Sequence, residues 1–194
     1  MKQEQFYLEK PSLKRKSQAI EYIEEHLKYK SNINGSGSLD DNYKDYESWL
    51  EKLELGSNPK TCPENKCPGF TYFLIEKNSD EIIGMINIRY NLNEEMLLHG
   101  GHIGYGIRPT KRRHGYNKIN LYLGLLKCQE LNLDKVLLTA YDNNPASVRT
   151  ILSLRGILEN KIENENEILG RYWIDVSLSI KKNKEIYEKY LAKN

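Results

Sequence analysis

The chain has 194 residues, 39% of them hydrophobic and 29% charged, and 29 Lys and Arg against 27 Asp and Glu leave a formal net charge of +2. This balance is typical of a soluble globular protein, and it argues against both a disordered chain and a nucleic-acid footprint over the whole surface. No run of about 18 uncharged apolar residues predicts a membrane span, and the first residues contain nothing that resembles a signal sequence. We therefore expect a cytoplasmic protein that binds neither membrane nor nucleic acid.

The apolar pattern predicts helices early in the chain, followed by β-prone segments. In order, we expect a strand over 3–8, a helix over 13–29 with Ser12 as N-cap, a flexible polar loop over 31–38, a helix capped by Asp40 or Asp41, an irregular stretch over 56–68, and three antiparallel strands over 70–75, 82–90 and 101–107. The second half predicts a helix over 115–131, a buried strand over 135–141, a short helix over 144–154, a late strand over 168–180 and a last helix from Lys181.

The expected element order before that last helix is β-α-α-β-β-β-α-β-α-β-β, in which only the second of the two final strands, over 168–180, is given bounds, and this order describes an α+β fold. The length suits a single domain over 1–194, with a core over about 3–180 and a helical tail over 181–194.

Three cysteines are too few, and odd in number, for a disulfide framework. Cys62 and Cys67 lie within one loop, but structural zinc needs four ligands and no second Cys or His pair follows at a suitable spacing. We expect reduced thiols and no metal. A metal site or a redox pair is the alternative interpretation.

Five of the thirteen glycines lie between residues 100 and 115, in a strand that leads through a basic turn into a helix. This pattern indicates anion binding, because the first N–H groups of a helix lack intrahelical partners and the helix dipole adds positive potential. Gly115 would let the backbone approach a phosphate. The cations expected to neutralise it are Lys111, Arg112, Arg113 and Lys118.

Other phosphate-binding patterns do not match this segment. The dinucleotide fingerprint G-x-G-x-x-G needs glycine at position 109, which is proline, and the P-loop pattern has no match. A solvated basic turn is the alternative interpretation of residues 111–114.

The run Arg112-Arg113-His114-Gly115-Tyr116-Asn117 resembles the R/Q-x-x-G-x-G/A signature of the GNAT superfamily, the Gcn5-related N-acetyltransferases. The preceding Ile103–Pro109 looks like that family's fourth strand, and Asn144-Pro145-Ala146-Ser147 with Gly156 is similar to its N-x-x-[SA]…G segment. The resemblance covers roughly residues 3–180. It implies a mostly antiparallel mixed sheet, splayed between strands 4 and 5 and flanked by helices, with a homodimer as one possible assembly.

The resemblance also implies the chemistry: a primary amine of a small molecule or peptide attacks the thioester of acetyl-CoA directly, and no metal takes part. The pantetheine arm would pair with backbone amides on the fourth strand, where the N–H of Ile107 would stabilise the oxyanion. The N–H groups of Arg113 through Lys118 would hold the pyrophosphate. The implied cofactor-binding residues are Tyr105, Gly106, Ile107, Arg112, Arg113, His114, Gly115, Tyr116, Asn117, Lys118 and Asn144.

Two positions depart from the family pattern. Asn117 stands where Gly or Ala is usual, and Ile151 stands where many members carry a tyrosine that protonates the departing thiolate. Either another group takes that role or the thiolate leaves unassisted. The tyrosines that could replace the acid are Tyr72, Tyr90, Tyr105 and Tyr141.

Two residues are candidates for the acceptor side: Arg89, which could hold an acceptor carboxylate, and His102, which could act as a base or be hydrogen-bonded to its neighbours. The sequence assigns no catalytic residue beyond these candidates. Two other functions stay open at this point. One is a non-catalytic acyl-CoA sensor on the same fold, suggested by Ile151, and the other is an RNA-associated module using the basic turn over 111–118.

Overall fold

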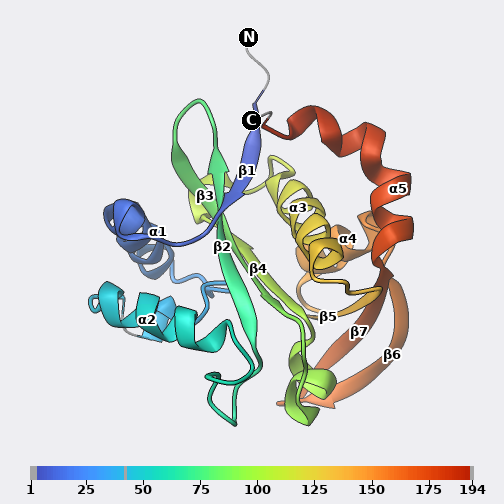
Figure 1. Cartoon of the computed structure of the whole chain (residues 1–194). Helices are drawn as coiled ribbons and strands as arrows, with labels where there is room; N and C mark the ends of the chain where they lie inside the picture. The colour runs from blue at the N-terminus through green and yellow to red at the C-terminus, as the bar shows by residue number, and fades with distance from the viewer. Residues whose placement is uncertain (1–3, 42, 193–194) are drawn as a thin grey trace.

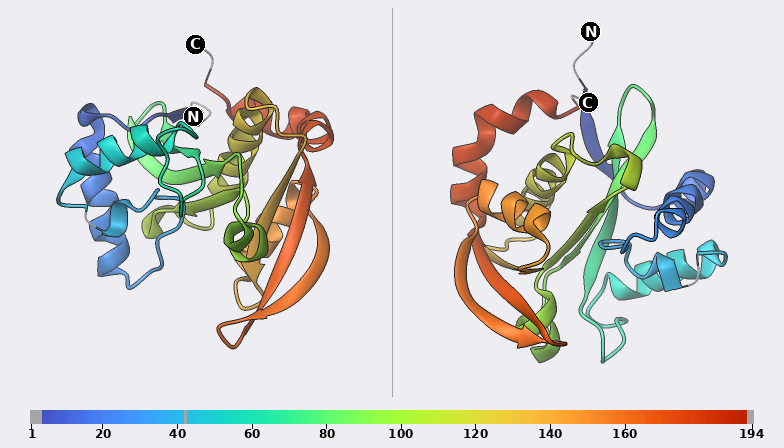
Figure 2. Two further views of the ribbon diagram at one scale, coloured as in Figure 1. Left: turned by 60° about the horizontal axis from the view of Figure 1, so that its bottom comes forward. Right: turned by 180° about the vertical axis from the view of Figure 1, so that it is seen from behind.

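The computed structural model describes residues 4–41 and 43–192. Four strands form an antiparallel sheet in the order β1-β2-β3-β4 (Figure 1): β1 (Phe6–Glu9), β2 (Gly69–Glu76), β3 (Glu81–Arg89) and β4 (Ile103–Ile107). The predicted strand over 3–8 corresponds to β1, and its residue 3 lies outside the described residues. Helices α1 (Lys16–Lys28) and α2 (Tyr46–Gly56) cover one face of this sheet, and α3 (Tyr116–Glu130) covers the other (Figure 2).

A second antiparallel sheet has the order β5-β7-β6. Its strands are β5 (Lys135–Tyr141), β6 (Ile157–Asn164) and β7 (Glu167–Asp175), with α4 (Pro145–Ser153) between β5 and β6 and α5 (Val176–Tyr187) after β7. The α+β class is confirmed.

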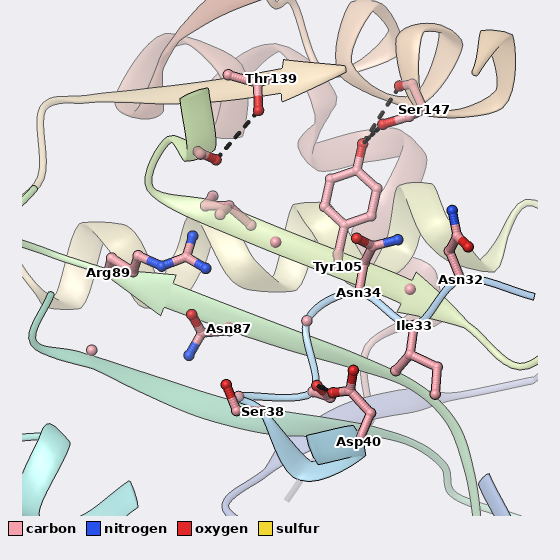
Figure 3. Close-up of a pocket in the computed structure, with 18 of the residues that line it drawn as sticks. Asn32, Ile33, Asn34, Ser38, Asp40, Asn87, Arg89, Tyr105, Thr139 and Ser147 are labelled. Carbon is pink, nitrogen blue, oxygen red and sulfur yellow. Dashed lines mark hydrogen bonds between the residues drawn. The ribbon is translucent and has the colours of Figure 1, made fainter. Parts of the chain in front are cut away.

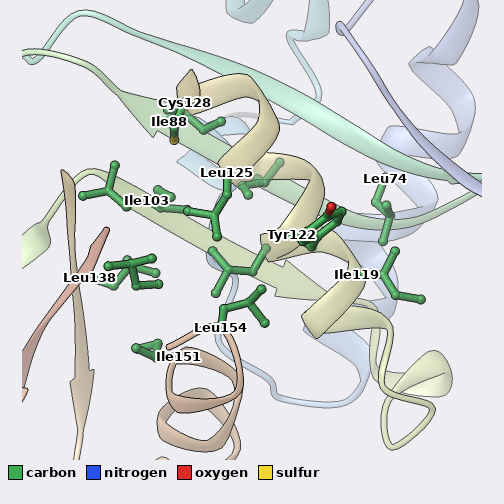
Figure 4. Packing of buried hydrophobic residues seen from close by; sticks show 14 of the residues in the cluster. Leu74, Ile88, Ile103, Ile119, Tyr122, Leu125, Cys128, Leu138, Ile151 and Leu154 are labelled. Atoms are coloured by element: carbon green, nitrogen blue, oxygen red, sulfur yellow. The ribbon is translucent and has the colours of Figure 1, made fainter. Parts of the chain in front are cut away.

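The core lies on both faces of the first sheet. Along β2, Phe73 packs with Trp49 of α2, whereas the neighbouring Leu74 joins the cluster that includes Tyr122 of α3 (Figure 4). Successive side chains of a strand point to opposite faces, so helices on both sides bury β2 completely from Thr71 onward. Each large apolar side chain buried in this way contributes about 1.5–3 kcal/mol.

The two sheets separate where β4 begins. The only bridge between them in the described chain joins Gly101 to Leu138. Beside it, the N–H of His102 donates to the Leu137 carbonyl (2.7 Å), and the Leu137 N–H donates to Nδ1 of the His102 ring (2.9 Å). The Leu137 N–H is thus bonded to the His102 side chain rather than to a backbone carbonyl of β4. The backbone hydrogen bonds between the two sheets do not continue beyond this point, and β4 diverges from β5, as the predicted splay requires.

One predicted N-cap is wrong, and the other is confirmed in position but not in its side-chain hydrogen bond. Asp40 and Asp41 belong to the 3-10 turn Leu39–Asp41, and α2 is capped by Asp45, which accepts from the Ser48 N–H. The first helix begins with a 3-10 turn over Leu13–Arg15, at which the Ser12 side chain makes no cap bond. Apolar periodicity locates a helix, but its first turn depends on which polar side chain reaches the free N–H groups.

The predicted C-terminal boundary is also wrong. β7 ends at Asp175, and α5 begins at Val176 rather than at Lys181. Val176, Leu178 and Ile180 alternate as in a strand, but the Asp175 carboxylate accepts from the Leu178 N–H (2.8 Å) and starts a helix. This helix packs on α3 rather than forming a separate tail, with ring centroids of Tyr122 and Tyr187 5.1 Å apart.

Two classes of feature are not found among the described residues. No helix there is long and apolar enough to cross a membrane. Within residues 4–41 and 43–192, no group of three or more His, Cys, Asp or Glu side chains could hold a metal ion. Cys62 and Cys67 are free thiols.

Candidate active site

A cleft of about 1780 Å³ crosses the β4 edge of the first sheet. Its walls come from the 30–41 segment, α2, the 62–69 segment, β3, the turn before α3, the end of β5 and α4. All the residues that the sequence implies for the cofactor line this cleft except His114, and Arg89 lines it too. His102 is not among the lining residues.

β4 offers free backbone groups to this cleft. At the end of the β3–β4 ladder, the Arg108 N–H donates to the Ile83 carbonyl (3.0 Å), so the even-numbered residues of β4 direct their polar groups to β3. In an antiparallel ladder the direction alternates from residue to residue. The N–H groups of Tyr105 and Ile107 therefore point away from β3, toward the gap between β4 and β5.

One face of β4 is covered by the segment over 31–38. A Cβ on Gly106 would lie 2.8 Å from the Asn34 carbonyl oxygen, and a Cβ on Gly35 would lie 2.7 Å from that of Gly104. The two backbones are therefore in direct contact, which only glycine permits. The sequence predicted a flexible loop here, but the segment is packed, with Ser36 buried and hydrogen-bonded to Asp40. Part of the glycine signal in β4 thus arises from chain packing.

The turn before α3 leaves the helix start open. Gly115 is the N-cap with a φ of 82°, a left-handed conformation that favours glycine, and nothing lies within 4 Å of a Cβ built there. No side chain caps the helix, so the N–H groups of Tyr116 and Asn117 have no intrahelical partner. The buried Oδ1 of Asn117 also lacks a partner among the described residues, and it could accept from a ligand N–H or O–H.

Two carboxylates fix the position of this turn. Arg108 donates from Nε to Glu25 (2.7 Å) and from Nη1 to Glu81 (2.6 Å), and the Thr110 N–H also donates to Glu25 (2.8 Å). Burial acts to raise the pKa of Glu25, but the Thr110 hydrogen bonds and the Arg108 charge hold it below its ordinary value. Lys111 lies 2.9 Å from Glu81, so this predicted phosphate cation already has a partner.

The remaining basic residues of the turn differ in what they touch. Arg112 donates to the Ile107 carbonyl (3.1 Å) and to Ser31 Oγ (2.6 Å), which ties the turn to the segment over 31–38. Tyr116 donates to Glu4 (2.6 Å) and is buried, so only its backbone is available to a ligand, and His114 stacks on its ring. Arg113 and Lys118 have no carboxylate partner within the described residues.

A tyrosine spans the gap between β4 and α4. The hydroxyl of Tyr105 lies 3.0 Å from Oγ of Ser147 (Figure 3). Burial raises the pKa of Tyr105, so its hydroxyl stays protonated at neutral pH. The side-chain oxygen of Asn144 caps α4 by accepting from the Ser147 N–H (3.2 Å). The amide nitrogen of Asn144 is therefore the atom left to make the predicted contact with a cofactor.

The structure separates the candidate tyrosines. Tyr72 and Tyr90 do not line the cleft, whereas Tyr105 and Tyr141 do. The Tyr141 hydroxyl accepts from Asn164 (2.7 Å), away from α4. Tyr105 is therefore the tyrosine placed at the centre of the gap.

Ile151, where the family pattern has its tyrosine, is fully buried and does not line the cleft. Its side chain belongs to the same core cluster as Leu138 and Leu154 (Figure 4). The position serves packing in this chain, so a proton donor has to come from another element.

His102 has a structural role at the divergence of the sheets. Burial and the nearby charge of Arg89 lower the pKa of His102 to about 4, so the ring is neutral at pH 7. Its Nδ1 already accepts from Leu137, which leaves the proton on Nε2. This arrangement fits a hydrogen-bonded strand-start histidine and leaves no free ring nitrogen to act as a base.

The GNAT acetyltransferase domain model matches residues 16–155. This chain belongs to the GNAT acetyltransferase family. Its members are acyltransferases, so the protein is an acyltransferase with the cleft as its candidate active site. Among curated proteins, no sequence matches the chain significantly.

Solved GNAT structures share the fold at low sequence identity. Mutant forms of the spermidine/spermine N-acetyltransferase SpeG from Vibrio cholerae match with a TM-score of 0.64 and 15% identity, over 92% of this chain and 98% of that one. The ribosomal-protein-S5-alanine acetyltransferase from Vibrio fischeri matches with a TM-score of 0.62 and 16% identity, over 90% and 94%. A GNAT-family acetyltransferase from Bacillus anthracis matches with a TM-score of 0.58 and 16% identity, over 91% and 98%.

Proposed function

We propose that this GNAT protein transfers the acetyl group of acetyl-CoA to a primary amine by direct attack. The observation that carries the proposal is the position of the Tyr105 and Ile107 amides, which point into the β4–β5 gap beside the uncapped start of α3. Free amides in an extended strand suit the amide-bearing pantetheine arm, and a helix start suits a diphosphate. The structural neighbours named above act on spermidine or spermine and on a ribosomal protein, which supports an amine acceptor.

The residues present fit this donor. Gly115 leaves open space above the helix start, and Arg113 and Lys118 bring positive charge without a carboxylate partner. Lys111 would contribute less, because Glu81 compensates its charge. Acetyl-CoA would supply the activated acetyl group. The backbone amides of β4 would hold its pantetheine arm, and the charges of Arg113 and Lys118 would hold its phosphates.

The proposed chemistry needs two groups of this chain at the reacting atoms. The amine nitrogen bonds to the thioester carbon, and the N–H of Ile107 stabilises the negative charge that develops on the carbonyl oxygen. The C–S bond then breaks, and the Tyr105 hydroxyl gives its proton to the leaving sulfur. The surplus proton of the amine passes to solvent or to a base, which returns the proton to Tyr105.

The test is a release assay for the CoA thiol, run with acetyl-CoA and a panel of polyamines, aminoglycosides, amino acids and peptide N-termini. Thiol release that requires an amine, with acetylated amine as the product, is the expected result. Tight acetyl-CoA binding without turnover on any amine would instead identify the protein as an acyl-CoA sensor. Thermal stabilisation by NADH equal to that by acetyl-CoA would contradict the assigned donor.

A further inference from the structure

Four arginine side chains of this protein are buried or half-buried, and one of them has no carboxylate partner among the described residues. Arg15, Arg108 and Arg171 each contact one or two carboxylates at 2.6 to 2.9 Å. Arg89 is half-buried at the cleft and has no carboxylate within 4 Å among the described residues. Its one side-chain hydrogen bond to the described residues runs from Nη1 to the Gly101 carbonyl (3.1 Å).

An unpaired guanidinium in this position is costly. Removing a charge from water without a counter-ion costs several kcal/mol, and the fold offsets that cost at the other three arginines. At Arg89 burial lowers the pKa of the guanidinium, an effect that nearby Cys67 opposes only in part. The fork of donors on the guanidinium remains available to a bidentate acceptor.

The neighbours of Arg89 place this charge on the acceptor side of the cleft. Asn87, two residues earlier on the same face of β3, pairs in register with Gly104 of β4. The Asn87 amide nitrogen donates to Thr71 Oγ1 (3.0 Å), so its oxygen faces the cleft near Arg89 (Figure 3). The Asn87 oxygen, which can bind a cation, therefore lies between the Arg89 guanidinium, which can bind an anion, and the backbone amides of β4.

We propose that Arg89 binds the carboxylate of the acceptor, so that the acceptor class is an amino acid rather than a polyamine. Arg89 holds the carboxylate in a bidentate contact, and the Asn87 oxygen accepts from the amine next to the β4–β5 gap. The inference rests on the proposed acetyl transfer and narrows its substrate class.

Matched amines that differ only in the carboxylate test the inference. The pairs are ornithine with putrescine, lysine with cadaverine, and tyrosine with tyramine, all assayed with acetyl-CoA. We expect kcat/KM to be about 10²-fold higher for the carboxylate member of at least one pair, the size typical of a buried charge pair. Lysinamide should behave like cadaverine, because it keeps the shape of lysine and loses the charge.

Arg89→Gln should remove this preference. We expect kcat/KM for the carboxylate member to fall by about 10²-fold, mainly through KM, while the value for its decarboxylated partner changes little. Arg89→Lys should retain part of the preference, and Arg155→Gln, at an exposed arginine, should retain all of it. If Arg89→Gln does not fold, thermal stabilisation of the wild type by amino acids over their amides, with CoA present, gives the same comparison.

The outcomes separate this inference from the proposed function. Acetylation of the decarboxylated amines as fast as, or faster than, their amino-acid partners would overturn the carboxylate site and leave acetyl transfer established. A preference that survives Arg89→Gln unchanged would also overturn it. Failure to bind acetyl-CoA at all would count against the proposed function instead.

Discussion

The imidazole Nδ1 of His102 accepts a hydrogen bond from the buried N–H of Leu137 at 2.9 Å, at the point where the two sheets separate. Removing the ring leaves that N–H without an acceptor. We therefore expect His102→Ala to lower the free energy of unfolding by about 1–3 kcal/mol, measured by urea denaturation at pH 7.5. His114→Ala, at an exposed histidine, is the matched control and should change little.

The same contact predicts how stability depends on pH. His102 has a pKa of about 4 in the folded protein against an ordinary value of 6.5, so the unfolded chain takes up the proton first. Its contribution to stability is complete above pH 6.5 and is lost as the pH falls toward 4. The difference in unfolding free energy between wild type and His102→Ala should therefore shrink over that interval. A constant difference would mean that the folded and the unfolded chain protonate His102 at the same pH, and it would contradict the lowered pKa.

Gly115 provides the test of the donor site. Gly115→Glu places a negative charge at the open start of α3, and we expect at least 10²-fold weaker acetyl-CoA binding by calorimetry. Gly115→Ala should cost about 1–2 kcal/mol of stability through its left-handed φ, yet retain binding, because the space around its Cβ is open. Asn132→Glu makes the same charge change at another left-handed position, beyond the far end of α3, and should bind normally. Unchanged affinity in folded Gly115→Glu would mean that the pyrophosphate lies elsewhere.

The signature motifs allowed part of this site to be predicted, because each is a short run within one turn or strand. The order of the elements and the open helix start at Gly115 follow from local residue patterns, and the gap beside Tyr105 follows from the family resemblance that the motifs carry. Contacts between distant segments did not follow. Glu25 and Arg108 are 83 residues apart, and nothing in the spacing of either predicts that Glu25 fixes the turn before α3.

The glycines of β4 show a second kind of limit. Their clustering was interpreted through ligand binding alone, whereas Gly106 also makes room for the backbone of Asn34. A glycine pattern records that something approaches the backbone closely, and it does not tell a ligand from another part of the chain. The boundaries of β6 had no apolar pattern to mark them, because its side chains are almost all exposed.

Tyr105→Phe tests the proton donor. General acid assistance typically contributes about 10²–10⁴-fold, so we expect kcat to fall by at least 10²-fold with acetyl-CoA binding retained. The loss should shrink with an acetyl thioester of a more acidic thiol, whose thiolate needs no proton to leave. Tyr141→Phe, at another tyrosine that lines the cleft, should keep its rate. An equal loss of rate for both donors would leave Tyr105 with only a packing role through Ser147.

Restoring the family's tyrosine at its usual position should fail in this chain. Ile151 is fully buried, and a Cβ on Gly156 would already lie 2.3 Å from its Cγ2, so no space is available for a larger ring. We expect Ile151→Tyr to lower the free energy of unfolding by about 1–3 kcal/mol, as overpacked cores do, without raising the acetylation rate per folded molecule. Leu152→Tyr, one residue on and half-exposed, is the control and should leave both quantities unchanged. A faster Ile151→Tyr enzyme, with a rate that no longer depends on Tyr105, would show that the ring reaches the gap and that α4 can repack to deliver the acid.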